Sequence, residues 1–209
     1  MQPGTVGIVL AAAAAHAVWN LASKYKREDT LLFVWAYTGA SALLCVPLGL
    51  ALVATGRQAL DWHLVVGCAV SAGLHIVYSL TLQAGYDRAD LGVVYPVARG
   101  TGPMLTMLLA VLLLGERLGP VAVGGALLIV AGILVVSGSP FGSKSRHPLQ
   151  GLLWGAATGA TIAAYTLWDN YSVRSWHLAP VSYYAGTLAL QSLILTATVL
   201  RRRHRMAAA

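Results

Sequence analysis

LGVVYPVARGTGPMLTMLL, residues 91–109, places one arginine and two prolines inside an otherwise apolar run. Arg99 is permanently charged, and a charge at membrane depth normally faces the interior of a helix bundle. Pro96 and Pro103 lack a backbone donor, which frees the carbonyls of Gly92 and Arg99. Irregular backbone in a bilayer is tolerated only beside protein or water. The segment therefore predicts a proline-broken helix that lines an internal polar space.

The rest of the sequence repeats this apolar character. The chain has 209 residues, of which 57% are hydrophobic and 10% charged, and its mean hydropathy is +0.69. A helix needs about 20 apolar residues to cross a bilayer. Seven such runs predict an all-α, polytopic transmembrane helix bundle with no separate soluble domain; they lie near 4–24, 31–54, 63–84, 91–114, 120–138, 150–170 and 180–200.

The net charge of +7 is concentrated at the ends of the predicted helices, which is typical of membrane loops and argues against nucleic acid as a partner. The more basic side carries Lys24, Lys26, Arg27, Arg88, Lys144, Arg146, Arg201, Arg202, Arg203 and Arg205, and the other side carries Arg57, Arg117 and Arg174. Because basic loops favour the cytoplasm, this distribution predicts an external N-terminus and a cytoplasmic tail.

Four predicted helices carry polar stripes at helical spacing, in which residues three or four apart share a face. The candidate substrate-binding residues are His16, Trp19, Asn20, His75, Tyr78, Tyr95, Arg99, Tyr165 and Asp169. Two alternatives remain for these stripes. The Ser and Thr positions beside them could form ordinary interhelical hydrogen bonds, and Arg99 could pair with Asp169 or Asp90 as a structural contact.

Two other predicted helices are interpreted as structural. Gly124, Gly125 and Gly132 in the fifth helix are small residues that allow close helix packing or dimerisation. Trp35, Tyr37 and Thr38 in the second helix favour an aromatic belt at the membrane interface over a binding site.

Motifs of several other protein classes do not occur. The sequence contains no GxxxxGK, GxSG or HExxH, so it indicates no catalytic residues, no metal site and no enzyme activity. His16 and His75 could ligate haem across the bundle, but two isolated histidines are a weak signal, and we expect no cofactor.

Several motifs in order resemble the EamA family of the drug/metabolite transporter superfamily. They are HAVWNLASK (16–24), LQAGYDRADLGVVYPVARGTGPMLTMLLAVLLLGERL (82–118), GALLIVAGILVV (125–136) and TIAAYTLWDNYSVR (161–174). The resemblance implies a multi-pass secondary transporter of the cell inner membrane, built from two inverted five-helix repeats around a central cavity. It implies a first repeat at 1–138, a loop at 139–149 and part of a second repeat at 150–209.

Members of this family have ten helices, so the seven predicted here suggest a chain truncated after its seventh helix. The N-terminus of family members is usually inside, which disagrees with the charge distribution. We expect transport of a small metabolite or amphiphilic compound, in which Arg99 would bind an anionic group and His75 or Asp169 would respond to protons. The alternative is a non-transporting fragment or scaffold in the lipid bilayer, completed by a homodimer or a complementing half.

Overall fold

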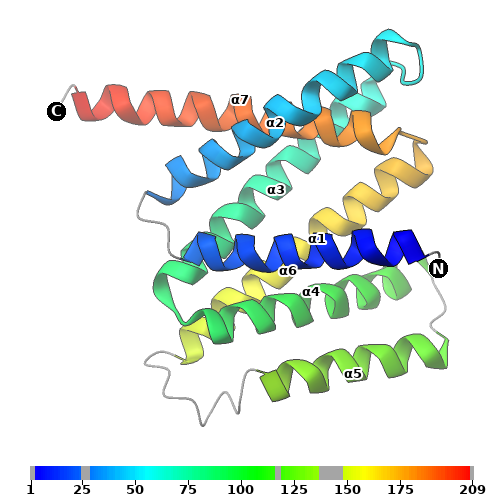
Figure 1. The fold of residues 1–209 in the computed structure, drawn as a ribbon, viewed down its shortest axis with the longest axis vertical. Coiled ribbons are helices and arrows are strands. Elements are labelled where there is room, and N and C mark those ends of the chain that lie inside the picture. Colours follow the sequence, from blue (N-terminus) through cyan, green and yellow to red (C-terminus); the bar gives the residue numbers. More distant parts are fainter. Residues whose placement is uncertain (1–2, 25–28, 116–118, 137–147, 208–209) are drawn as a thin grey trace.

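The computed structural model describes residues 3–24, 29–115, 119–136 and 148–207, and these form seven α-helices and no strand (Figure 1). The helices are α1 (Pro3–Lys24), α2 (Thr30–Ala54), α3 (Trp62–Arg88), α4 (Leu91–Leu114), α5 (Pro120–Val136), α6 (Pro148–Ser175) and α7 (Pro180–Ala207). The predicted all-α fold is confirmed. The most visible differences are that α3, α6 and α7 extend several residues beyond the predicted apolar runs.

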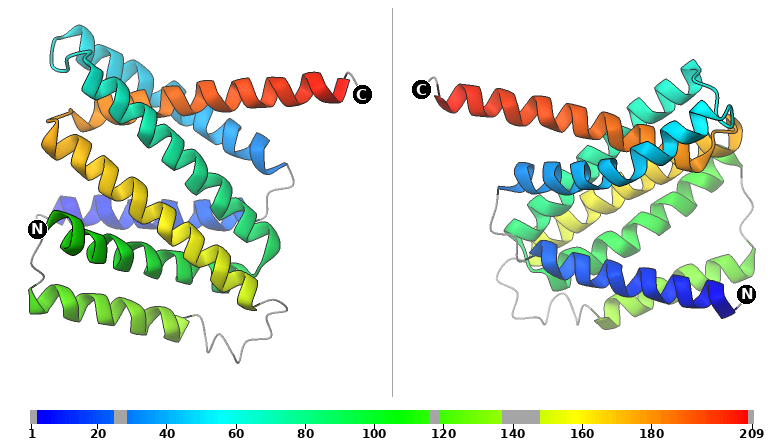
Figure 2. Two further views of the ribbon diagram at one scale, coloured as in Figure 1. Left: turned by 180° about the vertical axis from the view of Figure 1, so that it is seen from behind. Right: turned by 45° about the horizontal axis from the view of Figure 1, so that its top comes forward.

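The helices alternate in direction, and α3 and α6 form the centre of the bundle (Figures 1 and 2). Helix α6 packs on α3 and α4, and α7 packs on α2 and α3. Helix α5 lies against α4 at the periphery, and α1 makes a short contact with α3. The C-terminal ends of α1, α3 and α7 therefore lie at the same edge as the N-terminal ends of α2, α4 and α6 (Figure 1).

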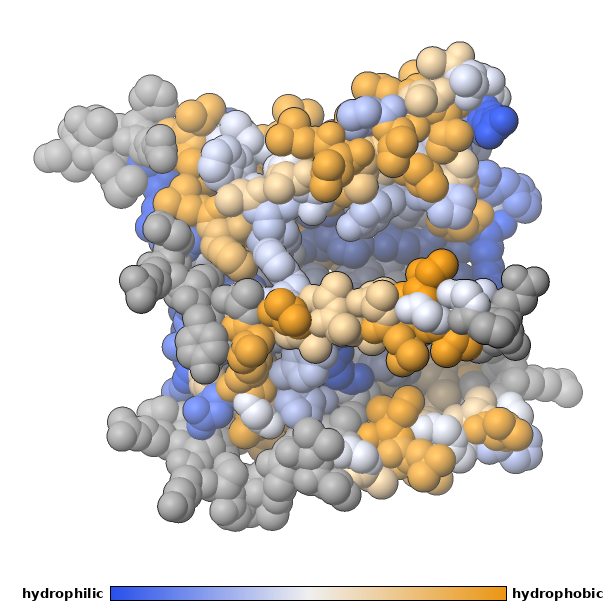
Figure 3. Space-filling model, viewed as in Figure 1, coloured by the Kyte–Doolittle hydropathy of each residue, from blue (hydrophilic) through white to orange (hydrophobic). Residues whose placement is uncertain are grey.

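The outward surfaces of the helices are apolar, as a membrane-embedded bundle requires. Exposed side chains include Leu43, Leu44, Val121 and Leu128, each more than 70% accessible. On the face shown in Figure 3 many apolar residues lie on the outward sides of the helices, while hydrophilic residues lie in the recess between α1 and the α2–α7 pair. Three described helices are long and apolar enough to cross a membrane by themselves: Thr30–Ala54, Trp62–Arg88 and Pro180–Arg202.

Helix α4 is continuous from Leu91 to Leu114 although it contains Pro96 and Pro103. The predicted break at these prolines is therefore wrong. Each proline removes one hydrogen bond from the helix, but packing along α6 holds the segment helical. Pro96 itself is buried in the bundle.

A row of glycines on α6 allows the close packing of α4. The row is Gly151, Gly155 and Gly159, opposite Val93, Val97 and Thr101 of α4. A Cβ atom added to Gly155 would lie 2.7 Å from the Cβ of Val97 and 3.0 Å from the carbonyl oxygen of Val94. Because those contacts are too short, only glycine lets the two backbones approach this closely. The glycines Gly124, Gly125 and Gly132 of α5, in contrast, have open space where a Cβ would lie.

Two polar contacts join α2 to α7. The Trp35 indole donates a hydrogen bond to the Thr196 hydroxyl (2.8 Å), and Arg202 forms an ion pair with Asp29 at the start of α2 (2.9 Å). Partial burial alone would raise the pKa of Asp29, but its hydrogen bonds with Arg202 and the Leu31 amide hold that pKa below its ordinary value. The carboxylate is therefore charged at neutral pH and also caps α2.

We predict that Gly155→Ala destabilises the bundle because the new methyl group collides with Val97 and with the α4 backbone. Overpacking of this kind costs about 1–3 kcal/mol. Thermal unfolding in detergent, followed by tryptophan fluorescence, should show a lower Tm for this variant. Gly124→Ala is the matched control, since its methyl group meets nothing. Equal Tm values for the two variants would contradict the packing described here.

Candidate functional site

A polar cavity of about 220 Å³ lies between α1, α2, α3 and α7. Its lining residues are His16, Trp19, Tyr37, Thr38, Ser41, His75, Tyr78, Ser79, Leu82, Gln83, Tyr184, Leu188 and Gln191. Two of its side chains are almost fully buried but have polar atoms without a hydrogen-bond partner, the Thr38 hydroxyl and the Gln83 amide oxygen. Both atoms are buried within the cavity wall, and an unpaired buried polar atom is costly.

One side of the cavity is supported by the carboxylate of Asp169. Ser71 and Tyr183 each donate a hydroxyl hydrogen bond of 2.7 Å to its Oδ1. Oδ2 lies 3.0 Å from Nε2 of His75, whose side chain lines the cavity. The carboxylate therefore connects α6 to both α3 and α7, and it fixes the orientation of His75 from behind.

Tyr165 connects this carboxylate cluster to a second charged group. Its ring stacks on His75 with a centroid distance of 4.2 Å and meets Tyr78 edge to face at 5.3 Å. Aromatic pairs in these geometries stabilise each other beyond the area they bury. Tyr165 thus holds two residues of the cavity wall, His75 and Tyr78, from α6.

The second charged group is the guanidinium of Arg99 on α4. Its Nη2 lies 2.6 Å from Nε2 of His16, and its Cζ lies 5.4 Å from the centre of the Tyr95 ring. Tyr78, Tyr95 and Tyr165 are close enough to interact with it electrostatically. Arginine can only donate, so Nε2 of His16 accepts and is unprotonated in this contact. His16 therefore lies between the cavity and the positive charge.

The structure thus brings most of the predicted residues together. His16, Trp19, His75 and Tyr78 line the cavity, while Tyr95, Arg99, Tyr165 and Asp169 contact those residues or one another from behind. Trp19 also stacks on Phe33 at 5.7 Å and meets Tyr37 edge to face at 5.2 Å. The side chain of Asn20 lies outside the part of the chain that the structure describes.

Several lining residues are missed or misassigned when the sequence alone is considered. Tyr37 and Thr38 were assigned to an interfacial aromatic belt, but both lie in the cavity wall. Gln83 was not singled out at all. One signal could have identified them: Thr38 and Ser41 lie three residues apart on α2, and Ser79 and Gln83 lie four apart on α3, so each pair continues a polar face. Trp35 fits the original interpretation better, since it is partly exposed at the α2–α7 contact.

The described contacts do not match an Arg99 ion pair with Asp169 or Asp90, or haem ligation by His16 and His75. Within the described residues, no ion pair joins Arg99 to Asp169 or Asp90, because Asp169 is held by Ser71, His75 and Tyr183. The Nε2 atoms of both His16 and His75 are engaged by other side chains, which does not suit axial ligation of haem. In the described ranges, no three His, Cys, Asp or Glu side chains are grouped as a metal site would need.

A helical bundle with an apolar exterior and an internal polar cavity, supported by one arginine and one aspartate, belongs to the class of multi-pass membrane proteins. Residues 4–138 match the EamA-like transporter family, and the chain belongs to that family. It is therefore a membrane transporter of the drug/metabolite transporter type. No curated protein and no solved structure matches the chain. The assignment of residues 150–209 to a second repeat stays a prediction.

We predict that Asp169→Asn lowers stability because three donors lose a charged acceptor. Hydrogen bonds to charged groups contribute about 1.5–3 kcal/mol each, so Tm in detergent should fall clearly. Asp90→Asn is the control, since Asp90 precedes α4 without a side-chain capping bond. Asp90→Asn should change the stability of the protein by no more than about 0.5 kcal/mol. If Asp169→Asn were equally neutral, the carboxylate would not hold α3, α6 and α7 together.

Proposed function

We propose that the protein is a secondary transporter of the cell inner membrane that moves a small metabolite or amphiphilic compound through the central polar cavity. The observation that carries this proposal is the convergence of polar side chains from α1, α2, α3 and α7 on one internal space. Polar groups inside a membrane are expensive, and those lining a cavity typically mark a substrate path.

Arg99 would set the charge preference of the site. Its guanidinium has a histidine and tyrosines around it in place of a neutralising carboxylate. A substrate with an anionic group would therefore compensate a charge that the described side chains leave uncompensated. His16 would link Arg99 to a bound substrate, because its Nε2 accepts a hydrogen bond from Arg99 and its side chain lines the cavity.

His75 and Asp169 would be the proton-sensitive pair. His75 faces the cavity, while its Nε2 contacts the carboxylate of Asp169. Protonation of either group would change the charge of this wall. Substrate movement would be coupled to a proton gradient if binding of the substrate and protonation of His75 or Asp169 either exclude or favour each other.

The aromatic part of the wall favours a substrate with an apolar portion. Trp19, Tyr37, Tyr78 and Tyr184 contribute rings to the cavity lining. Such rings bury apolar surface and still offer a polar edge, as is common in ligand pockets. Together with Arg99, they suit a small compound that has an anionic group at one end and an apolar group at the other.

We predict that Arg99→Gln abolishes most of the transport. A substrate is first chosen from a panel of small aliphatic and aromatic carboxylates. The chosen compound is one that moves protons in proteoliposomes loaded with the pH-sensitive dye pyranine. Loss of a charge-assisted hydrogen bond of about 1.5–3 kcal/mol corresponds to a fall of about ten-fold to a hundred-fold in flux at low substrate concentration.

Arg174→Gln is the matched control, because Arg174 is exposed at the end of α6 and should leave flux unchanged. Arg99→Lys, which keeps the charge but loses the planar donor group, should restore part of the flux. Unchanged flux in Arg99→Gln would remove Arg99 from the site. A panel that yields no flux with the unsubstituted chain would favour the scaffold alternative.

A further inference from the structure

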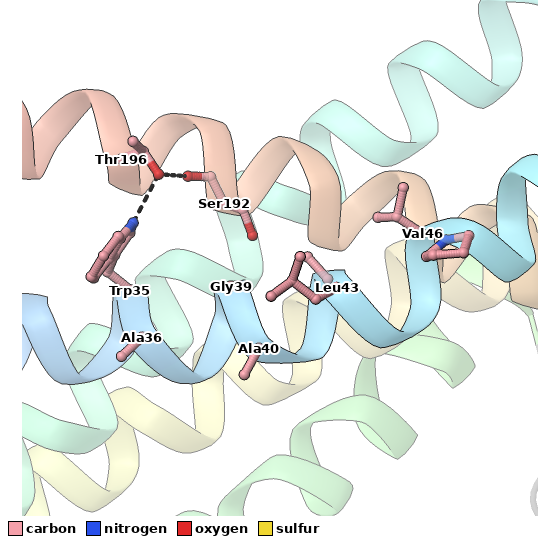
Figure 4. Close-up of a pocket in the computed structure, with 10 residues that line it drawn as sticks. Trp35, Ala36, Gly39, Ala40, Leu43, Val46, Ser192 and Thr196 are labelled. Atoms are coloured by element: carbon pink, nitrogen blue, oxygen red, sulfur yellow. Dashed lines mark hydrogen bonds between the residues drawn. The ribbon is translucent and has the colours of Figure 1, made fainter.

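A second, larger cavity lies on the outside of the bundle, between α2 and α7. This groove has a volume of about 670 Å³, and its walls include Gly39, Ala40, Leu43, Val46, Ser192 and Thr196 (Figure 4). Ligand pockets are typically about 300–1,000 Å³ in volume. The groove is separate from the central cavity, and α2 lies between the two, since Thr38 and Ser41 face the centre.

The walls of the groove are almost entirely apolar. The Thr196 hydroxyl accepts from the Trp35 indole and donates to the Ser192 carbonyl (Figure 4). The Ser192 hydroxyl is buried and therefore does not reach the groove surface. Gly39 has open space where a Cβ would lie, so the floor is hollow at this point. The described walls of the groove therefore offer a ligand almost no polar surface.

One end of the groove lies toward Arg202 of α7. Trp35 and Thr196 lie at that end, and Arg202 is fewer than two helical turns from Thr196 along α7. Arg202 remains about half exposed although it pairs with Asp29. The sequence places arginines at 201, 202, 203 and 205, and three more cations at 24, 26 and 27 just before α2.

We infer that the α2–α7 groove binds one acyl chain of an anionic phospholipid, whose phosphate is held by Arg201 and Arg202 near the end of α7. The apolar walls match the chain, and the basic end matches the phosphate. Clusters of four or more basic residues beside a membrane helix are typical sites for anionic lipids. A second copy of this chain packed symmetrically along α7 would instead bring two sets of these arginines together, which like-charge repulsion opposes.

Quenching of Trp35 by lipids with dibrominated acyl chains tests this inference. The protein is reconstituted with dibrominated phosphatidylglycerol or with phosphatidylcholine carrying the same chains. Subtraction of the Trp35→Phe variant isolates the Trp35 signal from that of the other tryptophans. Each basic residue near an anionic lipid contributes about 1 kcal/mol. We therefore expect phosphatidylglycerol to quench Trp35 with an apparent affinity at least about five-fold higher.

Two variants separate the acyl contact from the charge contact. Gly39→Leu fills the groove and should abolish the quenching of Trp35 by either lipid, while Gly124→Leu on α5 should not. The triple variant R201Q/R202Q/R203Q should retain quenching but equalise the two lipids. Should Gly39→Leu fail to fold, as judged by its elution from a sizing column, Ala40→Ile fills the same groove.

Three results would overturn the inference. The first is equal quenching by the two lipids in the unsubstituted protein. The second is quenching that persists in a correctly folded Gly39→Leu or Ala40→Ile variant. The third is weak quenching by both lipids together with a dimer that these variants dissociate, which would assign the groove to a second copy of the chain.

Discussion

The carboxylate of Asp169 is the group on which the interior of this bundle depends. An ionised side chain within a membrane protein is tolerated only when partners replace its hydration, and here Ser71, His75 and Tyr183 do so. Because those donors come from α3 and α7 while Asp169 is on α6, satisfying one charge fixes the relative position of three helices. The same contacts orient His75 toward the cavity.

The charge of Arg99 is stabilised by different partners. No carboxylate among the described residues neutralises it; a histidine from α1 and tyrosines from neighbouring helices surround it instead. The two charges are thus kept apart, one behind His75 and one behind His16, and Tyr165 lies between the two clusters. A paired arginine and aspartate would stabilise the bundle but leave little charge available to a substrate. In the described structure each charge instead contacts a histidine that lines the cavity.

The sequence predicted the helices and much of this cavity for a simple physical reason. Polar residues at three- or four-residue spacing in an apolar helix must share a face, and that face must avoid lipid, so His16, His75 and Tyr165 could be expected inside. Spacing does not reveal which helix lies opposite. Glycines on α5 and α6 look alike in the sequence, yet within the described residues Gly155 packs tightly and Gly124 does not. Likewise, the continuity of α4 through Pro96 depends on packing along α6 that no local pattern encodes.

A transport route through the shared cavity requires that water reach it, and cysteine accessibility on α2 tests this most directly. Ser41 lines the cavity, whereas Leu43, two residues away, is exposed on the outer surface. In a background with Cys45 and Cys68 replaced, Ser41→Cys in intact membranes should react readily with a small hydrophilic methanethiosulfonate, and Leu43→Cys should react slowly. Reaction of Ser41→Cys no faster than that of Leu43→Cys would contradict the existence of a hydrated internal cavity.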